Sequence, residues 1–506
     1  MSNLQQLPVS MRRKCKENTG RTGKENEMLS FGTGGWRAII GDEFTRDNIS
    51  SLAQAIADYI KNQADQREAL GFVIGYDRRF LSQKAAVWMS EVMAANGLTV
   101  YFIKEVAPTP LIMYTILSSG LEYGIAVTAS HNSSDYNGVK LFVDGGKDAT
   151  QDITDQVEVN WNRLKQKDIK RMEYDEALRL GRIQITDPFN SYIDNILSSI
   201  ELEKIKERRL KILIDPMYGV SRTCLAAVLV SARCQVDVIN DRHDPLFGGR
   251  LPSPSANTLN KLKDMVVERN YDLGVATDGD ADRLGIVDEK GNFIHPNDIL
   301  VLLYYYLLEY KKLRGSVVRN IATTHLLDRI AIDHGQVCYE VPVGFKHISS
   351  AMEEHQAIIG GESSGGLTIN GRIRGKDGIF AAALMAELIS VAGKNISGLL
   401  EEIHERYGRL WSEERDYSFS EKRKKELYRL LFEEKKLPAY SEPVKHISYL
   451  DGVKIYFEND GWIIVRFSGT EPVLRIFSEM ESKEEAYEAV KQMEEFLQLN
   501  QIKATA

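Results

Sequence analysis

The sequence predicts an α/β protein built from three related α/β domains and a smaller C-terminal α+β domain. Short apolar runs of the kind found in buried strands alternate with helical patterns, and this cycle is passed through three times before residue 392. The length of 506 residues exceeds what a single hydrophobic core usually organises. We find no literal sequence repeat, so the relation between the three domains is inferred from the order of their elements.

The first domain is expected over residues 28–186. Its expected elements are helices at 49–60 and 81–96 and strands at 72–77, 99–103, 124–128 and 139–143. This alternation predicts a mainly parallel sheet. A loop after the strand at 124–128 would then lie at the carboxyl edge of the sheet, where α/β proteins bind ligands.

The second and third domains, 187–295 and 296–410, repeat the cycle. In the second we expect helices at 192–202 and 259–269 and strands at 210–215, 236–239 and 272–276. In the third we expect helices at 299–310, 326–333 and 378–392 and strands at 317–318, 337–341 and 357–360.

The fourth domain, 411–506, has a different pattern. The charged stretch 413–446 predicts a solvated helix with a linker. Beyond it we expect strands at 453–457, 462–467 and 474–477 and an amphipathic helix at 483–498.

Composition and charge exclude several classes of protein. A net charge of -8 argues against nucleic-acid binding, which depends on clustered Lys and Arg. The longest apolar run, 299–308, is about half the length needed to cross a bilayer. Residues 1–27 lack the apolar core of a signal peptide, so we expect a disordered tail, no membrane association and a cytoplasmic protein. The four cysteines lack CxxC spacing and indicate neither a disulfide framework nor a zinc site: Cys15, Cys224, Cys234 and Cys338.

Ser130 is the candidate nucleophile. A small, apolar run ends at Thr128-Ala129-Ser130-His131-Asn132, and we expect the turn to present the Ser130 hydroxyl to solvent, where it carries a phosphoryl group. The adjacent His131 suggests a hydrolase as an alternative. There is no G-x-S-x-G elbow, however, and neighbouring side chains of an extended chain point in opposite directions, so His131 is not automatically the base for Ser130.

Asp278, Asp280 and Asp282 predict a Mg²⁺ site. They alternate around a glycine between two apolar strands, and three carboxylates held so close would repel one another without a cation. The segment begins like an EF-hand loop, but Arg283 occupies the sixth position, where glycine is required, and the flanks are strands. A solvated turn with accidental acidic residues is the other alternative.

Three further loops favour recognition of a phosphorylated sugar. A strand leads into Arg466-Phe467-Ser468-Gly469-Thr470, with Arg475 soon after, and such guanidinium, hydroxyl and backbone N–H groups can cradle a phosphate. Glu362 and Ser364 lie in a glycine-rich turn, where they can bond to sugar hydroxyls. Lys346 lies in the loop 344–347. For each of these segments a turn without a ligand is the alternative.

Arg37 follows three glycines near the start of the first domain. These glycines let the backbone turn tightly, so that Arg37 can project toward an anion. A turn capped by a surface arginine is the alternative.

Together these segments resemble the α-D-phosphohexomutase superfamily, which includes phosphoglucomutases and phosphomannomutases. Five motifs stand in the family's order: F-G-T-x-G-x-R at 31–37, T-A-S-H-N at 128–132, D-G-D-x-D-R at 278–283, G-E-x-S-G at 361–365 and R-x-S-G-T-E-P at 466–472. The resemblance implies four domains around a central cleft, with a motif in each domain.

The resemblance also implies roles for individual residues. Ser130 would be the phosphoserine and would share the Mg²⁺ with Asp278, Asp280 and Asp282. The side chains around the phosphoryl group would be those of Arg37, His131, Lys140 and Arg283, with Lys140 as a candidate general base whose pKa is lowered by neighbouring cations. The sugar contacts would be Lys346, Glu362 and Ser364, and the distal phosphate would meet Arg466, Ser468, Gly469, Thr470 and Arg475.

The implied reaction interconverts hexose 1-phosphate and hexose 6-phosphate through a phosphoserine enzyme and a hexose 1,6-bisphosphate, with glucose 1,6-bisphosphate as activator. The expected partners are hexose phosphates only, and the protein would be a monomer or a homodimer. Ser133 stands where the family usually has proline. The segment 343–347 is similar to the G-x-K loop of phosphoglucomutases, which favours glucose phosphate, whereas 363–366 follows neither subgroup.

Three alternatives to a phosphoglucomutase remain. One is a phosphomannomutase or a dual-specificity enzyme, and another is an inactive sugar-phosphate-binding homologue. A Mg²⁺ phosphatase, which would release inorganic phosphate from a hexose phosphate, is the third.

Overall fold

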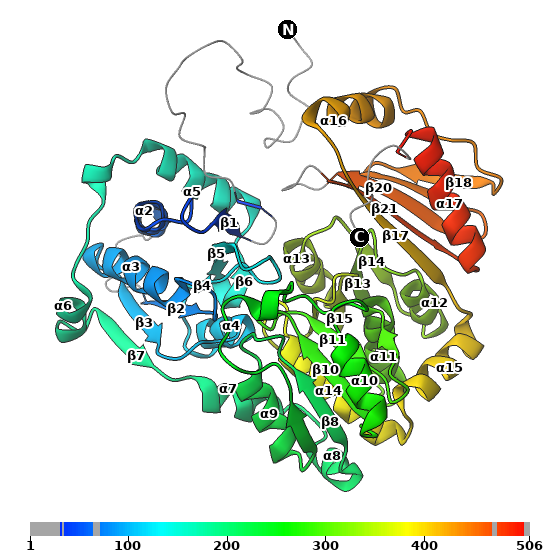
Figure 1. Ribbon diagram of the computed structural model, residues 1–506, viewed down its shortest axis with the longest axis horizontal. Coiled ribbons are helices and arrows are strands. Elements are labelled where there is room, and N and C mark those ends of the chain that lie inside the picture. The colour runs from blue at the N-terminus through cyan, green and yellow to red at the C-terminus, as the bar shows by residue number, and fades with distance from the viewer. Residues whose placement is uncertain (1–30, 33–34, 64–70, 468–472, 500–506) are drawn as a thin grey trace.

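The computed structural model describes residues 31–32, 35–63, 71–467 and 473–499 (Figure 1). The expected tail over 1–27 lies outside these residues. Figure 1 shows the first domain as one lobe and the fourth as another, with the second and third domains between and below them.

The first sheet has seven strands in the order β1-β5-β4-β2-β3-β7, with β6 beside β5. The strands are β1 (Trp36–Ile39), β2 (Gly71–Tyr76), β3 (Thr99–Ile103), β4 (Tyr123–Val127), β5 (Tyr136–Val143), β6 (Lys147–Asp148) and β7 (Ile183–Thr186). The helices are α2 (Arg46–Gln63), α3 (Ser82–Ala95), α4 (Thr109–Ser118), α5 (Gln151–Arg163) and α6 (Tyr174–Arg179). Phe72 and Ile74 of β2 pack into one core cluster and Val73 into another. Both faces are therefore buried, which explains the continuous apolar run.

The second sheet has the order β12-β11-β10-β8-β9. Its elements are α7 (Phe189–Leu197), α8 (Leu202–Arg208), β8 (Lys211–Asp215), α9 (Arg222–Ser231), β9 (Gln235–Val238), α10 (Asn260–Glu268), β10 (Leu273–Thr277), β11 (Leu284–Val287) and β12 (Phe293–Ile294). The single helix predicted at 192–202 is wrong. The hydroxyls of Ser198 and Ser199 both donate to the Asn195 carbonyl, and such bonds compete with the helical ladder and favour its end.

The third sheet has the order β14-β13-β15-β16. Its elements are α11 (Pro296–Glu309), β13 (Val317–Asn320), α12 (Leu326–Asp333), β14 (Cys338–Val341), α13 (Phe345–His355), β15 (Ile359–Gly361), β16 (Leu367–Ile369), α14 (Gly378–Ala392) and α15 (Ile396–Tyr407). No single helix in the described ranges is long and apolar enough to cross a membrane. Helices α14 and α15 meet that criterion only as a pair bent by 76°, and most of α14 is buried in the core.

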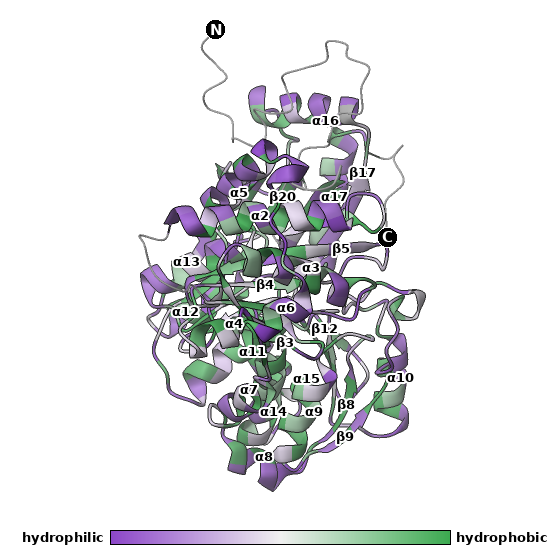
Figure 2. Ribbon diagram, turned by 90° about the vertical axis from the view of Figure 1, so that its left-hand side faces the viewer, coloured by the Kyte–Doolittle hydropathy of each residue, from purple (hydrophilic) through white to green (hydrophobic). Residues whose placement is uncertain are grey.

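The fourth sheet is antiparallel, in the order β17-β21-β20-β19-β18. Its elements are β17 (Trp411–Ser418), α16 (Glu421–Tyr428), β18 (Val444–Ser448), β19 (Val453–Phe457), β20 (Trp462–Phe467), β21 (Val473–Met480) and α17 (Lys483–Phe496). The prediction of a solvated helix with a linker over 413–446 is wrong at its start, because 413–418 belongs to β17. This strand lies at the sheet edge, where charged side chains are common. Figure 2 shows α16 largely in hydrophilic purple.

The first three domains share one strand arrangement, which confirms that they are related. A strand lies between two parallel neighbours in each sheet: β2 between β4 and β3, β8 between β10 and β9, and β13 between β15 and β14. One of these neighbours then pairs with the next strand along the chain in an antiparallel hairpin: β4 with β5, β10 with β11 and β15 with β16. Strands β20 and β21 form such a hairpin in the fourth sheet. Four of the five predicted motifs fall where the two strands of these hairpins are joined; the motif at 31–37 leads into β1 instead.

Candidate active site

Ser130 lies in the loop between β4 and β5, with its backbone in the left-handed region at φ 51°. Its Oγ donates to Asp278 Oδ2 at 2.6 Å, and its backbone N–H donates to Thr128 Oγ1 at 2.8 Å. The residue is 1% exposed, so the prediction that the turn presents it to solvent is wrong. The loop of the second domain lies against it: a Cβ on Gly279 would stand 2.7 Å from the Ser130 carbonyl oxygen, and only glycine permits this approach.

Arg79, which sequence reasoning missed, holds the Ser130 loop. Its side chain donates to the carbonyl oxygens of Ser130 and Asn132, both at 2.6 Å, and to those of Ser133 and Tyr136 at 2.7 and 3.0 Å. The guanidinium also pairs with Asp77 at 3.3 Å, and the residue is 3% exposed. The signal available in the sequence was an arginine just beyond the carboxyl end of β2, the strand next to β4.

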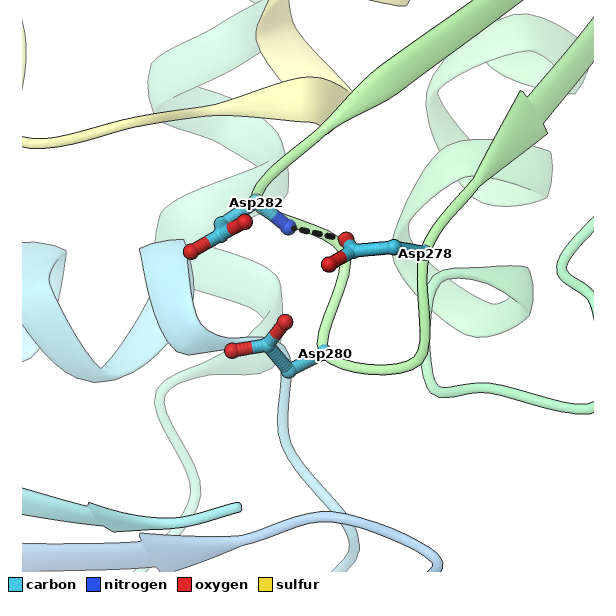
Figure 3. A group of neighbouring side chains, drawn as sticks. All are labelled: Asp278, Asp280 and Asp282. Carbon is cyan, nitrogen blue, oxygen red and sulfur yellow. Dashed lines mark hydrogen bonds between the residues drawn. The ribbon is translucent and has the colours of Figure 1, made fainter. Parts of the chain in front are cut away.

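The three aspartates lie in the β10–β11 loop and are buried (Figure 3), with one ligand atom from each within 4.8 Å of the others. Asp278 Oδ1 accepts the backbone N–H groups of Asp282 and Arg283 at 3.0 and 3.1 Å, which orients its other oxygen toward Ser130. Burial, together with Asp280 and Asp282, raises the pKa of Asp278 well above its ordinary value.

Two lysines pair with this cluster. Lys140 Nζ donates to Asp280 Oδ2 and Asp282 Oδ2, both at 2.6 Å, and Lys376, which sequence reasoning missed, lies 2.9 Å from Asp282 Oδ2. Burial lowers the pKa of Lys140, but Asp280 and Asp282 outweigh it and raise that pKa above its ordinary value. The expected lowering by neighbouring cations is therefore wrong, because the ammonium lies between carboxylates.

The carboxylates retain free oxygens that fit a divalent cation. Among the residues that the structure describes, Asp280 Oδ1 and Asp282 Oδ1 are buried and have no hydrogen-bond partner. A buried anionic oxygen without a donor is costly, and Mg²⁺ is coordinated by such hard oxygen ligands. The aspartate loop and Ser130 can therefore hold one cation between them.

Cationic side chains lie near His131, the neighbour of the Ser130 hydroxyl. Arg37 donates to the Asn132 side chain, and burial and Arg283 lower the pKa of Arg37. His131 Nδ1 lies 3.3 Å from Ser130 Oγ. Burial, then the charges of Arg283, Arg37 and Lys376, lower the pKa of His131 well below its ordinary value, so this imidazole is neutral. Such a cluster of cations favours a multiply charged anion on Ser130.

The β15–β16 loop adjoins the aspartate loop. The Leu284 N–H donates to the Gly365 carbonyl at 3.0 Å, so the sugar-binding candidates are held beside Arg283. Glu362 is 9% exposed and accepts from Asn320 Nδ2 at 3.4 Å, whereas Ser364 is exposed. Lys346, at the start of α13, donates to Gln151 Oε1 of the first domain at 3.1 Å.

Arg466 and Arg475 are directly opposite one another on β20 and β21. Cross-strand partners share a face of the sheet, where like charges repel, so an anion between them would be stabilised. Arg466 Nε donates to Asp451 Oδ2 at 3.0 Å, and Arg475 Nε lies 3.7 Å from Asp416 Oδ2. Ser468, Gly469 and Thr470 lie outside the described residues.

Comparisons with known protein families match four consecutive parts of the chain. Four domain profiles described as phosphoglucomutase/phosphomannomutase match in order: alpha/beta/alpha domain I at 28–168, domain II at 190–291, domain III at 295–407 and the C-terminal domain at 427–496.

Individual relatives match over most of their length. A phosphoglucomutase/phosphomannomutase of Thermococcus kodakarensis is 31% identical over 471 residues, which cover 92% of this chain and 99% of that protein. A phosphoglucosamine/phosphogalactosamine mutase of Sulfurisphaera tokodaii is 27% identical, with coverage of 92% and 99%. The crystal structure of a phosphoglucomutase/phosphomannomutase family protein from Burkholderia thailandensis has the same fold, with a TM-score of 0.77, 20% identity and coverage of 93% and 98%. The chain therefore belongs to the phosphoglucomutase/phosphomannomutase family of the α-D-phosphohexomutase superfamily, and it is a phosphotransferase mutase.

Proposed function

We propose that the protein interconverts hexose 1-phosphate and hexose 6-phosphate, with glucose phosphate as its preferred substrate. The observation that carries the proposal is the 2.6 Å hydrogen bond from Ser130 Oγ to Asp278, inside a group of cationic side chains and apart from the paired arginines of the fourth sheet. A hexose bisphosphate has two anionic ends, and the chain offers two cationic places for them. The loop 343–347 supports glucose, by its likeness to phosphoglucomutases.

Each half of the reaction exchanges one phosphorus–oxygen bond for another. A hexose hydroxyl oxygen attacks the phosphorus on Ser130 and loses its proton, while the bond from Ser130 Oγ to phosphorus breaks and Ser130 Oγ takes up a proton. After the bisphosphate turns end for end, Ser130 Oγ attacks the other phosphoryl group and loses its proton, and the sugar oxygen that leaves takes one up as the isomeric monophosphate departs. Arg466 and Arg475 hold the phosphate that does not react.

The residues around Ser130 stabilise the transferring group. Arg37, Arg283 and Lys376 place positive charge where charge builds up on the phosphoryl oxygens. Lys140 is an ammonium while it bonds to Asp280 and Asp282, so in this arrangement it stabilises anionic oxygens and does not accept a proton. Asp278, Asp280 and Asp282 would hold Mg²⁺, which neutralises phosphoryl charge when bound.

The test combines mass and activity. Intact-mass measurement and peptide mapping of the purified protein should place one phosphate on Ser130. With Mg²⁺ and the matching bisphosphate, glucose 1-phosphate should be converted faster than mannose 1-phosphate. Ser130→Ala should reduce turnover by orders of magnitude. Release of inorganic phosphate without isomerisation would instead identify a phosphatase, and absence of any turnover an inactive homologue.

Amino sugar phosphate is a second candidate substrate. The Sulfurisphaera tokodaii relative, whose name specifies glucosamine and galactosamine phosphates, is similar to this chain over 480 residues. Glucosamine 1-phosphate belongs in the same assay, and faster conversion of it than of glucose 1-phosphate would replace the proposed substrate while leaving the reaction unchanged.

A further inference from the structure

The fourth domain is fixed to the third through a buried polar cluster. Lys454 of β19 is 0% exposed, and its Nζ donates to the Ile321 carbonyl at 2.7 Å and to Glu340 Oε2 at 2.8 Å. It also lies 3.0 Å from His325 Nε2. A buried charge that loses its partner is strongly destabilising, so this cluster holds the start of β19 in one place against the third domain.

The turn that precedes Lys454 carries Asp451. Gly452 has φ 99°, and a Cβ there would stand 2.6 Å from the Val465 carbonyl oxygen, so this glycine lets the turn lie against β20. Asp451 Oδ2 then accepts two hydrogen bonds, one from Arg466 Nε at 3.0 Å and one from the Val343 backbone N–H at 2.9 Å. One carboxylate oxygen therefore joins the fourth domain to the third.

Both hydrogen-bond donors to Asp451 belong to segments of the proposed substrate site. Arg466 is one of the two opposed arginines for the distal phosphate. Val343 begins the segment 343–347, whose Lys346 reaches Gln151 of the first domain at 3.1 Å. This short segment thus contacts the first domain at one end and, through Asp451, the fourth domain at the other.

We propose that Asp451 is a positioning residue that sets Arg466 and the segment 343–347 against each other, so that the distal phosphate and the sugar are bound as one unit. This inference rests on the proposed function. The Asp451 carboxylate has two effects: it offsets the repulsion between Arg466 and Arg475, and it keeps the Nε edge of Arg466 turned toward the third domain. Without it, the guanidinium loses a charge-assisted bond and the Val343 amide loses its acceptor.

The matched variants are Asp451→Asn and Asp460→Asn. Asp460 lies in the fourth domain and pairs with the exposed Lys445 at 3.6 Å, so its replacement makes the same change of charge away from the third domain. Asp451→Asn should raise the KM for hexose 1-phosphate about tenfold, as expected for loss of a hydrogen bond to a charged group, whereas Asp460→Asn should leave it unchanged. Phosphate on Ser130 should stay at the wild-type level in both variants, because Ser130 has no contact with Asp451.

Amide hydrogen exchange supplies a readout that is independent of turnover. Hexose 1-phosphate should slow exchange at 343–347 in the wild type and in Asp460→Asn, but not in Asp451→Asn. If Asp451→Asn matches Asp460→Asn in KM and in ligand-dependent exchange, the inference is overturned while the proposed function stands. If the wild type shows neither turnover nor ligand-dependent exchange, the proposed function itself fails. A drop in kcat and unfolding temperature with KM unchanged would assign Asp451 a purely structural role and also overturn the inference.

Discussion

The loop that carries Ser130 is held by a side chain from a neighbouring strand. Ser130 has a left-handed backbone conformation, which costs a non-glycine residue roughly 1 kcal/mol or more, so the loop needs external support. Arg79 supplies it through four carbonyl oxygens at 2.6 to 3.0 Å. One of these belongs to Ser133, which replaces the usual proline, so Arg79 restrains the loop where proline does not.

Arg79→Lys should therefore lower kcat about tenfold or more, because an ammonium cannot span four carbonyl oxygens as a planar guanidinium does. Steady-state kinetics measures the effect. The control is Arg78→Lys: Arg78 precedes Arg79 but donates to the Asp241 and Arg242 carbonyls of the second domain, and its replacement should leave kcat near the wild-type value. Equal kcat values for the two variants would show that Arg79 does not hold the loop.

At the scale of elements, the site depends on hairpin loops from different sheets lying in contact. The β10–β11 loop touches the Ser130 loop at Gly279. The β15–β16 loop is joined to the end of the β10–β11 loop by the hydrogen bond from the Leu284 N–H to the Gly365 carbonyl. These contacts place the candidate metal ligands, the candidate nucleophile and the sugar-binding candidates in fixed relation, because every loop starts and ends in a buried strand.

Gly279→Ala should separate the first two loops and reduce kcat on the order of a hundredfold, as a displacement near 1 Å can do. The physical reason is that the new Cβ would meet backbone, which cannot rotate away. Gly398→Ala in α15 is the matched control, because nothing lies within 4 Å of its Cβ position and alanine favours a helix. A Gly279→Ala enzyme with wild-type kcat would contradict the close packing of the loops.

The contact between the third and fourth domains should weaken in acid. Burial raises the pKa of Glu340, but His325, Arg319 and Lys454 outweigh it and hold that pKa well below its ordinary value of 4.5. The folded protein therefore binds fewer protons here than the unfolded chain, so the stabilisation is complete above the ordinary value and is lost as the pH falls below it.

The unfolding temperature should consequently fall less steeply between about pH 6 and pH 4 in Glu340→Gln than in the wild type. Differential scanning calorimetry across this range measures the slopes. Glu458→Gln removes an exposed carboxylate of the fourth domain, on the other side of this interface, and should follow the wild-type slope. A Glu340→Gln protein with that same slope would mean that Glu340 does not stabilise the interface through its charge.

At the scale of the whole molecule, a ligand that bridges the first and fourth domains should stabilise the fold. At about one hundred times its Kd, glucose 1,6-bisphosphate should add about 2.7 kcal/mol to the free energy of unfolding, measured as an increase in unfolding temperature. Arg466→Ala should show a smaller increase over its own ligand-free unfolding temperature at the same ligand concentration. An equal increase in both proteins would place the second phosphate elsewhere.

The sequence predicts the domain order and most elements, because buried strands such as β10 and β11 are continuous apolar runs. It fails for β17, whose charged residues lie at a sheet edge. The candidate residues of the first three hairpin loops could be predicted from the sequence because each motif is a short continuous segment. The position of Arg79 beyond β2 was a signal in the sequence, but its four bonds to the Ser130 loop were not predictable. Lys376, the burial of Ser130 and the raised pKa of Lys140 also depend on contacts between segments far apart in the chain.

The hairpins of the first three sheets occupy corresponding positions in three separate sheets. Each hairpin loop joins strands that are held by their own sheet, so a loop residue that makes no contact with another loop can be exchanged without disturbing the strands. If the third loop contacts the sugar, as proposed, substrate preference would diverge there while the reaction at the first loop stays as it is, and one scaffold would serve relatives that handle different sugars.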